Sequence, residues 1–301
     1  MEHPKNLLRF DPEQAAVEII QFIQDRFQIL KRKKIIIGLS GGLDSSLTAT
    51  LAAEAIGADR VKLYYLPDRD SKPLHRKHAI LFSKQLGAEL KIIRITPALR
   101  ILRIYALLPL NLIPGRRLKS YAVNYVRRNQ LGLTGGSVLN ARLTGSGGSM
   151  VSRANAYINA KHRLRTVILF REAEKMNGLV MGAANKTEWL TGTFVQFGCD
   201  HSADVMPLLH IYRSQVEELA RIQGLPPEIL EKESDTDILP GLEDKGAMMG
   251  SFLIADQILW GLENGIPLSD LSDRFDQESV FYLNSLVQDS SFYREVPYSL
   301  L

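Results

Sequence analysis

The chain has 301 residues and a formal net charge of +4, with 45% hydrophobic and 23% charged residues. This composition is typical of a globular protein with a buried core, and it excludes collagen-like, low-complexity and wholly disordered chains. The single cysteine, Cys199, cannot form a disulfide within the chain or a cysteine-based zinc site, so we expect a reducing compartment, the cytoplasm. The N-terminal residues lack a signal-peptide pattern, and no apolar run approaches the roughly 20 residues that span a bilayer.

Helical and strand-like patterns alternate along much of the chain. Asp11 and Pro12 precede an apolar series with helical spacing, and the β-branched run at 34–39 then predicts a buried strand. The pattern continues with helices predicted over 44–56, 74–86 and 161–176 and strands over 61–66, 90–95 and 179–181. This alternation predicts an α/β fold in which one parallel sheet is flanked by helices on both faces.

The alternation stops between residues 97 and 152. An interrupted apolar stretch and a basic segment precede a Gly/Ser-rich region over 132–149. Its Gly145-Ser146-Gly147-Gly148-Ser149 part resembles a phosphate-binding loop by composition, but no strand precedes it, so a linker is favoured. We interpret 97–152 as an insertion of one or two short helices and a mobile loop within a single domain that spans 1–301. Basic residues beside an apolar segment can lie on a membrane surface, but packing in a core or a subunit interface is commoner. An acidic, turn-rich piece at 231–246 is predicted to be an active-site flap or a surface loop.

The charge is unevenly distributed along the chain. From Leu90 to Phe170 there is no Asp or Glu, and the basic residues of this segment carry +14: Lys91, Arg94, Arg100, Arg103, Arg116, Arg117, Lys119, Arg127, Arg128, Arg142, Arg153, Lys161, Arg163 and Arg165. Such a positive region concentrates anions, for example a phosphorylated small molecule, an acidic membrane surface or a nucleic acid. A solvated basic face, or one paired with the acidic remainder, explains the pattern equally well, so charge alone identifies no ligand.

A short glycine- and serine-rich loop follows the first predicted strand and leads directly into a helix. Its residues are Ser40-Gly41-Gly42-Leu43-Asp44-Ser45. Glycine N–H groups, hydroxyls and the N-terminus of the helix together form a phosphate-binding site. A carboxylate at Asp44 fits such a site if it holds a magnesium ion that screens the phosphates. A glycine turn that caps a helix is the structural alternative.

Other known motifs match the sequence of this loop less well. The loop lacks the Gly-Lys-Ser/Thr end of a Walker A motif and the glycine spacing of a Rossmann dinucleotide motif. Gly38-Leu39-Ser40-Gly41-Gly42 satisfies the Gly-x-Ser-x-Gly pattern of a hydrolase nucleophile, with Asp204 and His210 as its partners. These two residues lie too close in the sequence to end separate strands, which disfavours a hydrolase.

The Ser-Gly-Gly-x-Asp-Ser loop resembles that of the PP-loop (N-type) ATP pyrophosphatases, which cleave ATP between the α and β phosphates to adenylate a substrate. Further segments are similar to the ammonia-dependent NAD synthetases of that group: Asn-x-x-x-Arg-x-Arg at 159–165, a Gly-Ala start with Glu and Gly at 182–192, Tyr-Arg-Ser-Gln-Val-Glu-Glu-Leu at 212–219, and the basic tail before proline at 293–297. This resemblance implies an adenine nucleotide alpha hydrolase-like, Rossmann-like fold. It also implies that ATP adenylates the carboxylate of nicotinic acid adenine dinucleotide and that ammonia displaces AMP, with Mg²⁺ bound and the protein a homodimer.

The resemblance implies roles for individual residues. It assigns the phosphates of ATP to Gly38, Ser40, Gly41, Gly42, Asp44 and Ser45. Asp44 and Glu188 would hold Mg²⁺, and Arg163 and Asp204 would contact the dinucleotide. Glu188 also follows a predicted strand end, where sites of α/β folds lie. Arg213 stands where the family has a phosphate-binding lysine. It keeps the positive charge, but it presents a planar guanidinium in place of a compact ammonium group.

On the ATP side, two positions depart from the family pattern. Ala183 replaces an ATP-contacting threonine, and either Asp235 or Ser234 falls where the flap of the family carries serine or threonine. Both changes are expected to weaken contacts with ATP.

On the acid side, the departures remove cations. Gln196 replaces a substrate-binding lysine, and Phe292 and Tyr293 replace a His-Lys pair. The 197–204 segment has one residue more than the corresponding loop of the family, and Cys199 stands where the family has an aspartate. We expect Asp200 to take the place of that aspartate and to polarise or deprotonate the incoming ammonium. Arginines of the basic segment are candidates to replace the lost cations; alternatively, a different acid is adenylated.

Two further hypotheses concern partners. The chain could be a ligase of this fold that acts on another carboxylic acid, or an RNA-binding or tRNA-modifying protein whose binding weakens steeply with salt. Thiolating tRNA enzymes of this fold usually use paired cysteines, whereas Cys199 is alone. Because the phosphate-binding strand begins near residue 34, we expect free ammonia or a separate glutaminase to supply the nitrogen.

Overall fold

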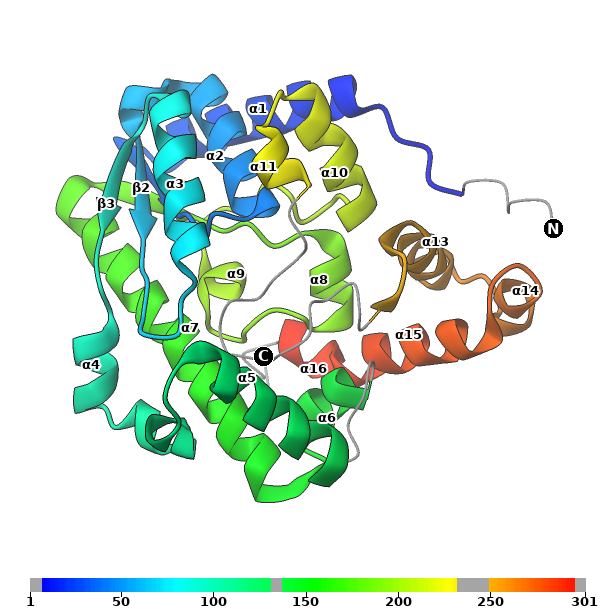
Figure 1. The fold of residues 1–301 in the computed structure, drawn as a ribbon. Helices are drawn as coiled ribbons and strands as arrows, with labels where there is room; N and C mark the ends of the chain where they lie inside the picture. Colours follow the sequence, from blue (N-terminus) through cyan, green and yellow to red (C-terminus); the bar gives the residue numbers. More distant parts are fainter. Residues whose placement is uncertain (1–6, 131–136, 232–248, 296–301) are drawn as a thin grey trace, which may run out of the picture.

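The computed structural model describes residues 7–130, 137–231 and 249–295 (Figure 1). Its centre is a parallel sheet with the strand order β3-β2-β1-β4. The strands are β1 (Lys34–Gly38), β2 (Val61–Tyr65), β3 (Glu89–Ile92) and β4 (Gly178–Met181). In the register of the sheet, Ile37 of β1 lies opposite Leu63 of β2 and Met181 of β4. The predicted α/β class is confirmed, although the strand expected over 90–95 ends earlier, at Ile92.

Helices cover both faces of the sheet. One face packs against α1 (Pro12–Ile29), α2 (Leu43–Ile56), α3 (Pro73–Leu86) and α10 (Arg213–Ile222). The other face packs against the long helix α7 (Gly148–Met176) and the turn η2 (Ile104–Ala106). Ile35 and Ile37 belong to the first layer and Ile36 to the second, since successive side chains of a strand face opposite sides. Burial on both faces explains the continuous isoleucine run of β1.

The segment predicted to be an insertion is more helical than expected. It contains α4 (Thr96–Ile101), η2, η3 (Pro109–Leu112), α5 (Arg116–Tyr125), the short π-helix η4 (Val126–Gln130) and α6 (Ser137–Thr144). The helix predicted over 161–176 already begins at Gly148, so Gly148 and Ser149 belong to α7 and not to a linker. Residues 150–160 contain neither Gly nor Pro, and nothing in this stretch interrupts the helix.

The C-terminal part of the chain packs beside the sheet as a separate apolar cluster. It comprises α13 (Phe252–Glu263), α14 (Leu268–Ser272) and α15 (Gln277–Asp289), joined by side chains of α6. The remaining short elements are η1 (Ala58–Arg60), α8 (Lys186–Thr191), α9 (Cys199–Ser202), α11 (Pro227–Leu230) and α16 (Ser291–Arg294). The predicted flap at 231–246 lies outside the described residues from position 232 onward. Among the described helices, none combines the length and the apolar character needed to cross a lipid bilayer.

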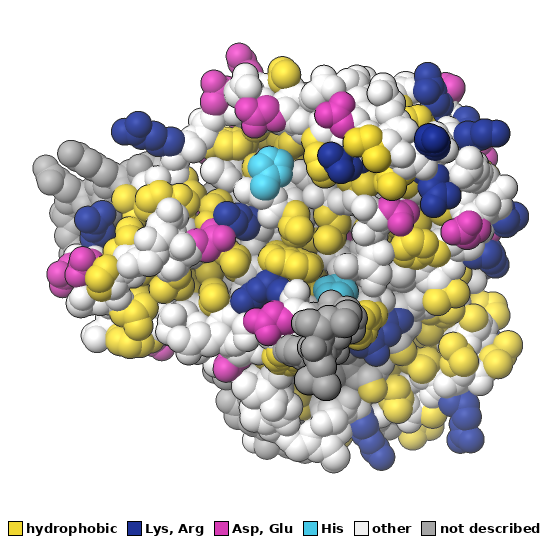
Figure 2. Space-filling view, turned by 180° about the vertical axis from the view of Figure 1, so that it is seen from behind, with side chains coloured by type: hydrophobic (Ala, Val, Ile, Leu, Met, Phe, Trp, Pro, Cys, Tyr) yellow, Lys and Arg dark blue, Asp and Glu magenta, His cyan; other side chains and the backbone are white. Residues whose placement is uncertain are grey.

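The surface is not uniform in charge. Figure 2 shows acidic and basic side chains mixed over the upper part of one face, whereas basic and hydrophobic side chains gather at its lower right, on the side where Figure 1 places α4. Ile101 and Leu102, at the end of α4, are 81% and 59% exposed. The insertion therefore contributes apolar as well as basic surface.

Candidate functional site

The loop after β1 is held by its own hydroxyl groups. The side-chain oxygens of Ser40 and Ser45 lie 3.0 Å apart, and the amide of Gly42 donates to Ser40 Oγ at 3.2 Å. Gly41 has a φ of +75°, and a Cβ at this position would lie 2.6 Å from the carbonyl oxygen of His75. A larger residue is excluded here, because both the backbone angle and the space require glycine. The loop thus backs onto the first turn of α3 and leads into α2.

Asp44, in the first turn of α2, is linked to two other elements. Its Oδ2 lies 2.7 Å from Nη1 of Arg213, the first residue of α10. Its Oδ1 accepts a hydrogen bond from Nδ2 of Asn185 at 2.9 Å. The oxygen of the same amide caps α8 by accepting from the backbone N–H of Glu188 at 3.0 Å. One asparagine side chain therefore joins Asp44 to the turn that carries Glu188.

Arg213 lies between these acidic residues and is only 7% exposed. Burial disfavours the charged guanidinium, but the carboxylates of Asp44, Glu217 and Glu188 outweigh this effect and raise the pKa of Arg213. Glu188 is thus close enough to act on the same cation as Asp44. The structure brings together Asp44, Glu188 and Arg213 beside the Ser40–Ser45 loop.

This arrangement fits a magnesium ion that binds together with phosphate. Mg²⁺ usually takes one or two carboxylates and completes its coordination with waters and phosphate oxygens. The Asp44 side chain is 22% exposed and remains accessible beside the Ser40–Ser45 loop. In the part of the chain that the structure describes, no group of three or more His, Cys, Asp or Glu side chains is placed to hold a metal. A metal held by Asp44 and Glu188 would therefore depend on oxygens from a nucleotide.

Asp256 of α13 is a site-supporting residue that the sequence did not reveal. Its carboxylate is fully buried and accepts hydrogen bonds from Thr187 Oγ1 at 2.5 Å and from the amide of Ser214 at 2.7 Å. Burial raises its pKa, and these donors oppose the rise. The carboxylate fixes the start of α8 against the start of α10, which carry Glu188 and Arg213. An acid that directly follows the apolar run Phe252–Ala255 at the start of α13 was the available signal.

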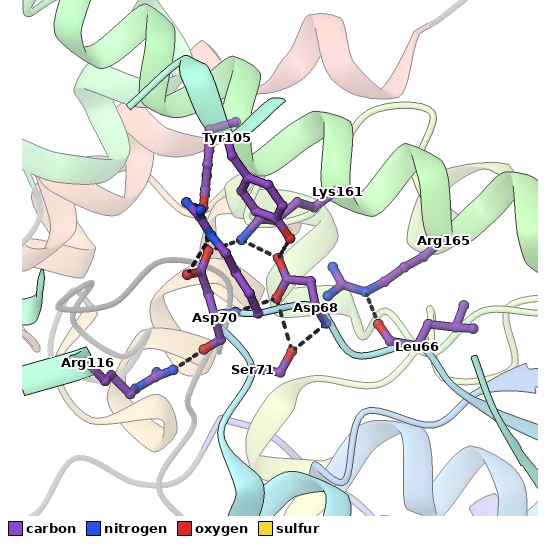
Figure 3. A network of polar contacts seen from close by, with 10 residues as sticks. Leu66, Asp68, Asp70, Ser71, Tyr105, Arg116, Lys161 and Arg165 are labelled. Carbon is purple, nitrogen blue, oxygen red and sulfur yellow. Dashed lines mark hydrogen bonds and ion pairs between the residues drawn. The ribbon is translucent and has the colours of Figure 1, made fainter. Parts of the chain in front are cut away.

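A second network of buried charges lies at the loop that follows β2 (Figure 3). Lys161 of α7 is fully buried, and its Nζ lies 2.6 Å from the carboxylates of both Asp68 and Asp70. The hydroxyl of Tyr157 donates to Asp70, and that of Tyr105 donates to Asp68 at 3.4 Å. Buried charges are stable when they are paired and hydrogen-bonded, as here. The network anchors the loop that leads into α3 onto α7.

Two arginines hold the backbone of the same loop (Figure 3). Arg165 Nε donates to the carbonyl of Leu66 at 3.0 Å, and Arg116 donates to the carbonyl of Asp70. Arg116 belongs to α5, so the insertion contacts the loop directly. Several cations of the +14 segment therefore have internal partners and do not form one solvated face. The sequence signal for this role was an Asp-x-Asp pair at a predicted strand end, which was not singled out.

The residues assigned to the acid substrate surround the loop between α8 and α9. Arg163 Nε donates to the carbonyl of Gln196 at 3.1 Å. One carboxylate oxygen of Asp204 accepts a hydrogen bond from the amide of Val180 in β4 at 2.7 Å, so that oxygen is bound to the sheet. Burial raises the pKa of the Cys199 thiol, and the charges of Asp200 and Asp204 raise it further. Both aspartates therefore lie near that thiol.

An aromatic cluster lines the same loop. Phe194 stacks on Trp189 with ring centroids 4.8 Å apart and on His201 at 5.6 Å. Tyr293 meets Phe194 edge-on at 6.0 Å, and Phe292 packs against Tyr293 at 4.3 Å. The carbonyl of Tyr293 lies 3.0 Å from His201 Nε2, and burial lowers the pKa of this histidine. The two residues that stand where the family has cations thus form part of an apolar wall.

The residues beside the Ser40–Ser45 loop and the residues assigned to the acid substrate come close to each other at the end of β4. A Cβ at Gly182 would lie 3.0 Å from the side chains of Ala203 and Met206, on the acid side. Ala183 follows it, half-buried, and the chain then reaches Asn185 on the ATP side. Asp235 lies outside the described residues.

The hydrolase alternative has no support in the geometry. The Ser40 hydroxyl lies against Ser45 and the Gly42 amide. Burial lowers the pKa of His210, and its hydrogen bond to the Pro207 backbone opposes this, while Asp204 is bound to β4. Within the described residues neither partner is bonded to Ser40.

Comparisons with known proteins identify the family. The model of the NAD synthase family matches residues 15–107 and 146–297. The chain is 36% identical over 277 residues to the NH3-dependent NAD+ synthetase of Thermotoga maritima, covering 92% of this chain and 95% of that protein. It is 31% identical over 284 residues to the enzyme of the same description from Coprothermobacter proteolyticus, covering 94% and 96%.

Solved structures share the fold. The NMN synthetase from Francisella tularensis has a TM-score of 0.70 at 22% identity, covering 97% of this chain and 99% of that one. The NH3-dependent NAD synthetase from Campylobacter jejuni has a TM-score of 0.66 at 23% identity, covering 97% and 100%. The family match over most of the chain and the relative at 36% identity show that the chain belongs to the NAD synthase family.

Proposed function

We propose that this member of the NAD synthase family catalyses the ATP-dependent amidation of nicotinic acid adenine dinucleotide with ammonia, forming NAD, AMP and pyrophosphate. The observation that carries the proposal is the junction of Asp44, Glu188 and Arg213 beside the Ser40–Ser45 loop. Two relatives named NH3-dependent NAD+ synthetases, at 36% and 31% identity, support the choice of acid and of nitrogen donor. Neither a different acid nor a role in RNA modification is favoured by these similarities.

ATP is the co-substrate, and its phosphates lie on the loop from Gly38 to Ser45 and at the N-terminus of α2. Backbone N–H groups and the helix dipole favour negative charge there. Asp44 and Glu188 hold Mg²⁺, which neutralises charge on the phosphates when it is bound. Arg213 is positioned beside both carboxylates to pair with the charge that develops on the leaving pyrophosphate.

The acid is held on the other side of β4 by residues of α7, of the 192–204 segment and of α16. Arg163, Gln196, Asp204, Phe292 and Tyr293 orient it so that its carboxylate attacks the α-phosphorus of ATP. Ammonia then displaces AMP, after Asp200 takes a proton from ammonium. No protein nucleophile is needed, because positioning and charge stabilisation account for the rate.

Product analysis tests the proposal. The protein is incubated with ATP, Mg²⁺, ammonium and nicotinic acid adenine dinucleotide, and AMP and NAD are separated by chromatography. We expect the two products in equal amounts and no NAD when ammonium is omitted. AMP that forms only when nicotinic acid mononucleotide replaces the dinucleotide would move the assignment to that acid, and no AMP with either acid would contradict the proposal.

Two further features belong to the same proposal. We infer a homodimer, as the family resemblance implies. Ile101, Leu112 and Tyr121 are 81%, 87% and 71% exposed, and exposed apolar side chains are common at interfaces. We place the protein in the cytoplasm because a chain with the single cysteine Cys199 gains nothing from an oxidising compartment. Sedimentation velocity and cell fractionation test these two inferences.

A further inference from the structure

Arg142, in the last turn of α6, is a cation on the acid side that the proposed reaction does not use. Its guanidinium donates to the backbone carbonyl of Phe194. Phe194 lies two residues before Gln196, the position at which the family resemblance implies a lysine. The side chain of Tyr293 acts on the pKa of Arg142 and is therefore its neighbour. The basic segment thus places a guanidinium at the loop that is proposed to hold the acid.

Contacts on both sides of Arg142 fix its position. The carbonyl of Arg142 accepts a hydrogen bond from Nδ2 of Asn155 in α7 at 3.1 Å. A Cβ added to Gly192 would lie 2.9 Å from the Leu143 side chain, so α6 is seated directly on the start of the loop. The guanidinium is therefore held in place by rigid elements and is not a solvated side chain.

Arg142 differs from Lys161 and Arg213 in its charge balance. Lys161 is paired with Asp68 and Asp70, and Arg213 with Asp44. Within the described residues no carboxylate pairs with Arg142, and its Nε is buried without a hydrogen-bond partner. Burial lowers its pKa, because a desolvated charge without a counter-charge is costly. An anionic ligand would remove that cost.

Arg294, on α16 beside the same loop, is an arginine whose hydrogen-bond donors are used within the protein. Its guanidinium donates to the carbonyls of Trp189, Leu190 and Val287 and to the hydroxyl of Ser290. Arg142 has the same five N–H donors but uses one carbonyl acceptor within the described residues. The residue as a whole is half-buried, and its Nε is buried. Its fork of donors suits a planar carboxylate.

We propose that Arg142 is a specificity-determining residue that binds the carboxylate of the acid substrate and supplies the cation that Gln196 lacks. The inference rests on the proposed amidation reaction. It also gives the insertion a function, since α6 carries the replacing cation to the loop after α8.

The first test separates the acid from the nucleotide. A charge-assisted hydrogen bond is worth about 1.5–3 kcal/mol, so Arg142→Met is expected to raise the KM for nicotinic acid adenine dinucleotide about 10- to 100-fold. The KM for ATP should change by less than about twofold, because Arg142 has no contact on the ATP side. Arg117→Met, which removes an exposed arginine of α5, is the matched control and should change neither value.

Binding of the product identifies the group that Arg142 recognises. NAD has the same diphosphate as the acid but an amide in place of the carboxylate, so Arg142→Met should leave the Kd for NAD unchanged. Equal losses for the acid and for NAD would assign Arg142 to the diphosphate and overturn the proposal. An unchanged KM for the acid would overturn it too, whereas a wild-type protein that forms no NAD would instead contradict the proposed function.

A relocated charge provides the sharpest test. In Arg142→Met/Gln196→Lys the cation returns to the position that the family uses, and most of the lost acid affinity should be recovered. A purely structural role of Arg142 predicts no recovery. If Arg142→Met does not fold, as judged by thermal unfolding, Arg142→Lys decides: it keeps the charge without the fork, so the KM for the acid should rise severalfold while that for ATP stays constant. Equal KM values for Arg142→Lys and wild type would contradict the proposal.

Discussion

The two sides of the site differ in how their charges are balanced. On the ATP side, Asp44 is paired with Arg213, and at the neighbouring loop Lys161 is paired with Asp68 and Asp70. On the acid side, Arg142 and Arg163 donate to backbone carbonyls. Side chains that already have charged partners keep their geometry before a ligand arrives, whereas cations on carbonyls gain most when an anion binds. We therefore propose that the protein itself fixes the ATP side and that binding of the acid completes the other side.

The largest expected effect concerns the preformed network at the β2 loop. Lys161→Met leaves two buried carboxylates without their cation and should lower the free energy of unfolding by about 3–5 kcal/mol, measured by urea denaturation. Lys62→Met removes one partner of the exposed pair with Glu89 and should cost about 0–1 kcal/mol. Lys161→Met/Asp70→Asn should recover part of the loss. Equal effects of the two lysine substitutions would show that the Lys161 network does not anchor the loop.

The next largest effect concerns the paired carboxylates at the phosphate loop. Asp44→Asn and Glu188→Gln should each reduce the turnover of ATP to AMP about 10²- to 10³-fold, because each removes charge stabilisation at the reacting phosphates. Glu217→Gln is the matched control, since Glu217 also lies near Arg213 but its carboxylate is 3.3 Å from Nε, on α10 itself. It should change turnover by less than about threefold. Turnover in Glu188→Gln close to that of wild type would contradict the proposal that Glu188 holds Mg²⁺ together with Asp44.

A smaller effect is expected from the close approach of the phosphate loop to α3. Gly41→Ala adds a methyl group 2.6 Å from the His75 carbonyl and should raise the KM for ATP about tenfold, since the loop must shift. Gly87 has a similar φ of +70°, but an added Cβ would meet no atom within 4 Å. Gly87→Ala therefore introduces only the strain of a left-handed backbone, which should lower the free energy of unfolding by about 1–2 kcal/mol. Its KM for ATP should equal that of wild type. A shift of equal size in both variants would mean that backbone strain alone, and not the contact with α3, shapes the site.

The smallest effect is a pH dependence away from both sides. Burial opposes ionisation of Glu172, but hydrogen bonds from Lys91 and Arg171 outweigh it and lower its pKa to about 2. A carboxyl whose pKa is depressed by folding stabilises the fold above its unfolded value of about 4.3, and that stability is lost as the pH falls towards 2. Glu172→Gln should therefore flatten the decline of the unfolding free energy between pH 5 and about pH 2. Parallel declines in wild type and variant would contradict the assigned ion pairs.

Local sequence patterns were sufficient to predict the fold class, and they indicated a candidate phosphate site. The β-branched run of β1, the glycine-rich loop and the acid at position 44 are all adjacent in the chain, so spacing alone indicates a phosphate site. Glu188 and Arg213 came from resemblance, and the structure places them beside Asp44. What these patterns could not show is that Asn185 joins Asp44 to α8, or that Asp256 joins α8 to α10.

The rest depends on contacts between distant segments. Lys161 was recognised as one of many cations, but nothing local indicates that it is buried between Asp68 and Asp70. The early start of α7 was missed because Gly147 and Gly148 suggested a linker, whereas Gly147 precedes the helix as its cap and Gly148 is its first residue. The position of Arg142 also required the structure, since α6 reaches the acid side only through packing on the 192–204 loop. Tertiary packing decides these features, and no periodicity records them.

Metal binding tests the central claim most directly, namely that Asp44 and Glu188 together hold the ion that accompanies ATP. Mn²⁺ is titrated in the presence of a non-hydrolysable α,β-methylene analogue of ATP and followed by electron paramagnetic resonance. We expect wild type and Glu217→Gln to bind Mn²⁺ with the analogue, and Asp44→Asn and Glu188→Gln each to weaken this binding at least about tenfold. Wild-type affinity for Mn²⁺ in either of the last two variants would contradict the account.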